Sequence, residues 1–256
     1  MTILGYDHAI YLVAEPGGLE TAARRFEELG FTITDRDDEG KESAATAQKL
    51  VCFEDGSYIE ILSIRDPQAR SRHRFAPFFV RGDGWVDTSV HTNDLAGARE
   101  RLTAAGLPFS GPHAHARRLR SGEPWGVSLI LPGIGAGHPA LPFVIEDTEG
   151  RDLRIPRHGT RHPNGVTGTA GVSVSVRDLD AVRPGFEALF GPAVPVAAPL
   201  QDCARALRYA VARRWLDVLE RPEADEGMIS LALMRPGAEG VTWLATGREG
   251  IALVGA

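Results

Sequence analysis

Cysteine is scarce in this sequence, with only Cys52 and Cys203 among 256 residues. The two lie far apart, each among apolar neighbours, so no disulfide framework is expected and a reducing cytoplasm is the simplest compartment. Long apolar runs are also missing, both near the N-terminus and elsewhere, which argues against a signal peptide or a membrane span. The expected class is therefore a soluble cytoplasmic protein.

An excess of positive charge is missing too, because the formal net charge is -6. Nucleic-acid binding needs a basic face, so a nucleic-acid partner is not expected. Three enzyme signatures are absent: the Gly-x-Ser-x-Gly elbow, the phosphate loop and the dinucleotide-binding glycine pattern after a first strand. The glycine-rich stretch 133–137 follows a strand and opens no clear helix, which indicates a flexible loop.

What the sequence does contain is a repeat. Three segments share one design, in which an alternating apolar strand and a short turn lead into an amphipathic helix closed by glycine. Asp94 and Asp178 are suited to cap two of the helices, because a carboxylate accepts hydrogen bonds from the free amides of the first turn. The strands span 8–13, 86–91 and 172–176, the helices 19–29, 95–105 and 179–190, and the closing glycines are Gly30, Gly106 and Gly191.

Strand-like runs follow each helix, so each unit has the order strand, helix, strand, strand, strand. The predicted fold class is α+β, built from repeated βαβββ modules. Dense proline and glycine punctuation places the modules at about 1–66, 83–150 and 165–256. The third module is the least regular, because Pro184 lies inside its helix. The runs expected after the helices are 31–34, 48–53 and 58–62; 108–113, 125–131 and 141–146; and 206–211, 215–220 and 228–234.

Four stretches carry a resemblance to a known family: Tyr6-Asp7-His8, residues 53–62, residues 142–146 and His162-Pro163-Asn164-Gly165. On these the chain resembles glyoxalase-like domain proteins of the vicinal oxygen chelate superfamily. The resemblance implies that the first two modules pair into a half-open barrel around a pocket, which makes residues 1–150 one domain and 165–256 a third, similar module. Members of this superfamily include isomerases, dioxygenases, epoxide-opening resistance enzymes and metal-free drug-binding proteins.

The resemblance also implies a site, because metal-using relatives take ligands from the first and fourth strands of two paired modules. Mapped through the repeat, these are His8 and Glu60 in the first module and Asp87 and Glu146 in the second. The corresponding place in the third module is Gly171, which supplies no ligand. One imidazole and three carboxylates suit a divalent ion such as zinc, nickel, manganese or iron. Glu60 and Glu146 would then be the catalytic carboxylates.

Two functions remain open at this point. The first is a metal-assisted lyase or isomerase acting on a small oxygenated molecule. The second is a metal-free small-molecule binding protein, with His8 and Glu60 hydrogen-bonding the ligand. The basic stretch from His113 to Arg120 either closes over the pocket and attracts an anion or forms a solvated hairpin. His91 is expected at the surface or in a turn.

Assembly is also open. Two modules complete one barrel, so the third leaves an apolar sheet face that needs cover. Either a homodimer through the third modules or the chain's own tail, residues 241–254, provides it.

Overall fold

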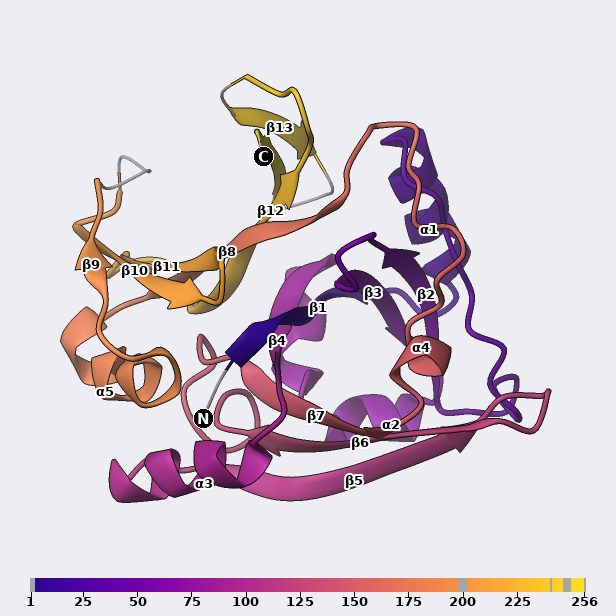
Figure 1. Cartoon of the computed structure of the whole chain (residues 1–256), viewed down its shortest axis with the longest axis horizontal. Coiled ribbons are helices and arrows are strands. Elements are labelled where there is room, and N and C mark those ends of the chain that lie inside the picture. The colour runs from indigo at the N-terminus through magenta and orange to yellow at the C-terminus, as the bar shows by residue number, and fades with distance from the viewer. Residues whose placement is uncertain (1–2, 198–201, 240, 246–249, 256) are drawn as a thin grey trace.

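The computed structural model describes residues 3–197, 202–239, 241–245 and 250–255. Two seven-stranded sheets contain all fourteen of the described strands (Figure 1). In spatial order the first sheet is β2-β3-β1-β4-β7-β6-β5 and the second is β13-β14-β12-β8-β11-β10-β9. No described helix is long and apolar enough to cross a membrane.

The first sheet is a curled half-barrel made by two modules. The central strands β1 and β4 are antiparallel, and each is parallel to the last strand of its own module, β3 or β7. This confirms the predicted pairing of the first two units. Its elements are β1 (Ile3–Val13), α1 (Leu19–Glu28), β2 (Thr46–Cys52), β3 (Tyr58–Ile64), β4 (Gly84–Thr92), α3 (Leu95–Ala104), β5 (Ser110–Arg118), β6 (Pro124–Leu131) and β7 (Phe143–Glu149). Between the modules lie α2 (Pro67–Arg72) and a 3₁₀ segment, η1 (Ala76–Arg81).

The second sheet repeats this arrangement with one unit shortened. Its elements are β8 (Gly168–Val176), α5 (Leu179–Phe190), β9 (Val194–Pro195), β10 (Arg205–Val211), β11 (Arg214–Glu220), β12 (Gly227–Met234), β13 (Val241–Ala245) and β14 (Gly250–Val254). A short helix, α4 (Arg151–Arg154), precedes it. Strand β8 is parallel to β11 and antiparallel to β12, and β12 is parallel to β14. Strands β12, β13 and β14 therefore take the place of a fourth module, and the described residues between β12 and β13 (235–239) form no helix.

Two expected strands differ from the structure. The run 228–234 was expected to close the third module, but β12 lies on the other side of β8 and begins the shortened unit. The run 31–34 contributes only an isolated bridge between Thr34 and Leu50. The expected helix signals are confirmed: Asp94 and Asp178 accept hydrogen bonds from first-turn amides, and Gly30, Gly106 and Gly191 have positive φ after the helices.

One apolar core runs through both sheets. It joins Tyr11, Phe26 and Trp85 of the first half to residues such as Val172 and Leu231 of the second. Helices α3 and α5 contact each other where the halves meet (Figure 1). The face for which a dimer partner was expected is thus buried inside the chain. The division into a unit ending near 150 and another beginning near 165 stays a prediction, since a single core spans both.

The described part of the expected covering tail, 241–245 and 250–254, lies in the second sheet as β13 and β14. Residues 246–249 of that tail lie outside the described residues.

Candidate functional site

A cavity of about 920 Å³ lies on the concave side of the first sheet. Strand residues alternate between the two faces, so β1 buries Tyr11 under α1 and turns His8 and Ile10 toward the cavity. Residues of the loop 35–42 also line the cavity, and this loop is joined to the β5–β6 hairpin where the backbone N–H of Glu39 donates to the carbonyl of Arg118. The cavity has an apolar floor formed by Ile10, Leu62, Phe75, Val127, Leu129, Leu131, Phe143 and Ile145.

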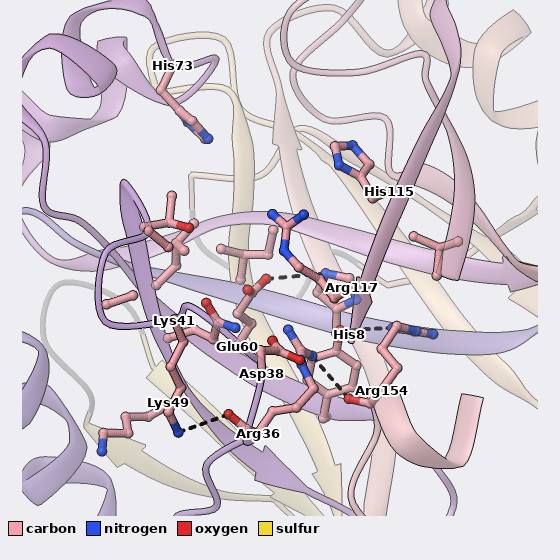
Figure 2. Close-up of a pocket in the computed structure, with 18 of the residues that line it drawn as sticks. His8, Arg36, Asp38, Lys41, Lys49, Glu60, His73, His115, Arg117 and Arg154 are labelled. Atoms are coloured by element: carbon pink, nitrogen blue, oxygen red, sulfur yellow. Dashed lines mark hydrogen bonds and ion pairs between the residues drawn. The ribbon is translucent and has the colours of Figure 1, made fainter. Parts of the chain in front are cut away.

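His8 is the central polar side chain of this cavity (Figure 2). Its Nδ1 lies 2.7 Å from Oδ1 of Asp7, and its Nε2 lies 3.6 Å from Oε2 of Glu60. The ring stacks on Tyr58 at 4.6 Å between centroids and meets the edge of Phe143 at 5.2 Å. Because an ionised carboxylate only accepts, Nδ1 carries the proton that Asp7 holds, and Nε2 is directed at the cavity.

Asp7 reaches His8 because β1 is irregular at this point. The pairing of β1 with β4 shifts by one residue between Tyr6 and His8, which inserts Asp7 as the extra residue of a β-bulge. Asp7 is fully buried, and its carboxylate accepts from Arg154 at 2.7 and 2.9 Å and from Arg151 at 2.8 Å. Burial raises the pKa of Asp7, but Arg154 and the His8 hydrogen bond outweigh it, so the pKa lies well below its usual range. A fixed negative charge therefore orients the imidazole.

The same two arginines bind a second carboxylate, Asp147 on β7. Arg154 donates to it at 2.7 Å and Arg151 at 2.6 Å. Nε2 of His91 lies 3.2 Å from the same carboxylate, so His91, expected in a surface position, is half-buried in an ion network. Sequence reasoning missed Asp7, Asp147, Arg151 and Arg154. The only available signal was the three-residue spacing of the arginines, which places them on one face of a helical turn.

Asp87 is paired with an arginine and does not line the cavity. Asp87 faces Ile10 across the β1–β4 pairing, is buried, and accepts from Nη1 of Arg74. Burial raises the pKa of Asp87, and the charge of Arg74 offsets only part of that effect. The Arg74 guanidinium lies over the rings of Phe75 and Phe143, at 4.1 and 5.0 Å, and lines the cavity.

Glu146 lies on the opposite face of the sheet from the cavity. Strands β3 and β7 are the last strands of the two modules. Tyr58 on β3 and Phe143 on β7 occupy equivalent positions, since both rings contact His8. Ile145 then takes the place of Glu60, and both line the cavity. The mapping through the repeat had placed Glu146 at the position equivalent to Glu60, one residue away from Ile145. A shift of one residue along a strand moves a side chain to the other face of the sheet.

The expected metal ligands are therefore not brought together. Of the four, only His8 and Glu60 line the cavity, and across the described residues no three His, Cys, Asp or Glu side chains are grouped to hold a metal. A zinc-like site takes three or four protein ligands. The donors present do not fit the ion that the resemblance implied.

The basic stretch of β5 faces this cavity. His113, His115 and Arg117 line it, and Figure 2 shows Arg117 extending into it from β5. His115 is exposed to solvent, but partial desolvation by surrounding atoms, followed by the neighbouring charges of Arg117 and His113, lowers its pKa. The hairpin itself is held by Arg120, which pairs with Asp37 at 3.0 Å.

Comparison with known proteins gives the family. The profile of the Glyoxalase-like domain family matches residues 6–190, from β1 through α5, so the chain belongs to this family. None of the curated proteins compared with the chain matches it.

Solved structures share the fold at low sequence identity. A hypothetical protein from Staphylococcus aureus has a TM-score of 0.73 at 14% identity, covering 98% of this chain and 99% of its own. A variant of 4-hydroxymandelate synthase from Streptomyces coelicolor has a TM-score of 0.59 at 14% identity, covering 92% of this chain and 72% of its own. A xylose isomerase-like TIM barrel/4-hydroxyphenylpyruvate dioxygenase fusion protein has a TM-score of 0.58 at 16% identity, covering 92% of this chain and 37% of its own.

Proposed function

We propose that this chain binds a small oxygenated molecule in the cavity of the first sheet, without a metal held by the protein. His8 and Glu60 contact the polar end of the ligand, and the apolar floor holds its body. The observation that carries this proposal is the arrangement of Asp7, His8 and Glu60. It directs one imidazole nitrogen and one carboxylate at a cavity of about 920 Å³, which is within the size range of small-molecule sites.

His8 is also able to move a proton in this site. Its Nδ1 is held by Asp7, so Nε2 accepts a proton from a bound molecule or returns one to it. Glu60, with its Oε2 3.6 Å from that nitrogen, is the second group within reach. The pair supports ligand binding directly and gives an isomerase or lyase the groups it needs for proton transfer.

Binding of a small molecule in the cavity is tested by titration with the neutral fluorescent probe N-phenyl-1-naphthylamine, whose emission rises in apolar surroundings. The wild type is expected to bind it, and Leu129→Glu, which puts a charge on the half-buried apolar floor, is expected to weaken binding by about tenfold or more. The matched control is Val80→Glu, because Val80 is 91% exposed and does not line the cavity. Equal loss in both variants, or no binding by the wild type, contradicts the proposal.

A metal-assisted lyase or isomerase is the second candidate. Its support is the 3.6 Å between His8 Nε2 and Glu60 Oε2, close to the roughly 3.3 Å between two ligand atoms about 2 Å from a tetrahedral ion. The remaining expected ligands are absent from the cavity, which makes this candidate the weaker one. A metal titration separates the two candidates.

A homodimer through the second half also stays a proposal. The apolar residues that motivated it, Val172, Val174, Leu231 and Leu233, are buried in the chain's own core. The expectation therefore rests on no uncovered face in the described residues. Light scattering at micromolar concentration decides it, because a monomer mass rejects the dimer.

A further inference from the structure

Strand β5 presents a basic face to the cavity. His113, His115 and Arg117 alternate along the strand and line the cavity, whereas Arg118, which follows directly, does not. The residues from His113 to Arg117 are exposed, so their side chains meet solvent or a ligand rather than core atoms.

The other cations of the cavity wall are mostly paired with carboxylates. Arg36 pairs with Asp38, Arg74 with Asp87, Arg154 with Asp7 and Asp147, and Lys41 and Lys49 with Asp35. Arg65 and Arg72 have no carboxylate partner within the described ranges. Arg65 donates to backbone carbonyls of the 35–42 loop, and Arg72 donates to the side chain of Gln68. The cations paired with carboxylates have little capacity left for an incoming anion, whereas Arg65 and Arg72 keep free donors.

Arg117 combines free donors with a place near His8 and Glu60 in the cavity (Figure 2). Within the described part of the chain no carboxylate lies in ion-pair range of its guanidinium, and its one hydrogen bond goes to the adjacent carbonyl of Ala116 at 3.1 Å. An arginine fork with free donors binds a carboxylate or similar anion through two parallel hydrogen bonds. The apolar floor beside it suits a ligand with an apolar body.

We propose that the ligand of this cavity is an organic anion, with its charged group bound by Arg117 between the imidazoles of β5 and the His8–Glu60 pair. The inference deepens the proposed function and rests on it. Arg117 fixes the charged end, and the floor holds the apolar part. Glu60 opposes a second negative charge on the ligand, which favours a monoanion.

The test compares two probes that differ by one sulfonate group: the anion 1-anilinonaphthalene-8-sulfonate and its neutral parent, N-phenyl-1-naphthylamine. Both are titrated against the intact chain and two variants. Arg117→Gln removes the proposed contact, and Arg118→Gln removes the same charge from the next residue of β5. Arg117 and Arg118 are both exposed, so both variants are expected to melt as the wild type does.

In Arg117→Gln, affinity for the sulfonate should fall by about tenfold or more, while affinity for the neutral probe stays within about twofold. Arg118→Gln should leave both affinities within about twofold. If the neutral probe binds but Arg117→Gln does not weaken sulfonate binding, or Arg118→Gln weakens it equally, the inference is overturned and the proposed function stands. If the neutral probe does not bind the wild type, the proposed function fails and the inference fails with it.

Discussion

At the scale of single residues, the site depends on one irregular position in β1. In a regular strand Asp7 and His8 would point to opposite faces, and the bulge brings the carboxylate to the ring nitrogen. His8 and Glu60 were predictable, because the strand alternation and the family resemblance both placed them. The bulge was not, since no side-chain pattern in Tyr6-Asp7-His8 distinguishes it from a regular strand.

Replacement of Asp7 by Asn tests the buried network. Asp7 is fully buried and is bound by both Arg154 and Arg151, so Asn removes a charge that balances theirs. We expect a loss of about 3–5 kcal/mol in the free energy of unfolding, measured in urea. Asp152→Asn is the control, because the Asp152–Arg157 pair is exposed and contributes about 0–1 kcal/mol. A similar small loss in both variants would show that the network is not stabilising.

The second carboxylate of the network predicts a pH dependence. Burial raises the pKa of Asp147, but hydrogen bonds from His91, Arg154 and Arg151 outweigh it and hold that pKa well below its usual range. Since the folded-state pKa is lower than the unfolded one, this stabilisation is complete above about pH 5 and declines as the pH falls below about 4. In urea unfolding, the difference between wild type and Asp147→Asn should narrow from pH 7 to about pH 3. A constant difference contradicts the assignment.

At the scale of elements, local sequence signals were sufficient to predict the helices and most strands. They did not predict which strands are neighbours in a sheet. Asp94 and Asp178 marked helix starts, and Gly30, Gly106 and Gly191 marked helix ends, because each satisfies a local backbone requirement. Strand neighbours are set by tertiary packing. For that reason the position of β12 was misassigned, and the register of β7 was predicted one residue off at Glu146.

Gly171 on β8 tests how the second sheet is packed. A Cβ built at this glycine would overlap the indole of Trp215, which is in register with Gly171 on β11. The guanidinium of Arg208 lies 5.0 Å from the same ring. Gly171→Ala should cost about 1–3 kcal/mol in unfolding free energy through overpacking. Gly84→Ala, also in a strand, meets nothing within 4 Å and should cost less than about 0.5 kcal/mol; equal effects would contradict this packing.

At the scale of the whole molecule, the two halves share a core and several hydrogen bonds, including buried bonds between Ser57 and Thr169. The hydroxyl of Tyr6 on β1 donates to the backbone carbonyl of Trp215 on β11 at 2.6 Å. Because the two halves share this contact and a common core, the apolar residues of the third module are covered within the chain. The repeat predicted the number of helical modules, but it did not predict how the second sheet packs on the first, because that contact joins residues more than 200 positions apart.

Removal of two tyrosine hydroxyls tests this link. Tyr6→Phe should lower the free energy of unfolding by about 1–2 kcal/mol, because the carbonyl of Trp215 loses its buried donor. Tyr209 is the matched control, since its buried hydroxyl has no hydrogen-bond partner in the described structure. Tyr209→Phe should therefore be neutral or stabilising. If both variants lose stability equally, the hydrogen bond from Tyr6 to Trp215 contributes nothing.

The most direct test of the account is a calorimetric titration of the metal-free protein with zinc and manganese, repeated with Glu60→Gln. The account assigns the cavity to ligand binding through His8 and Glu60 without a protein-bound metal, because Asp87 is held by Arg74 and Glu146 lies on the opposite face. It predicts no stoichiometric metal uptake by the wild type and no difference in Glu60→Gln. Stoichiometric binding by the wild type, weakened about tenfold or more by Glu60→Gln, would contradict it and restore the metal-assisted reaction.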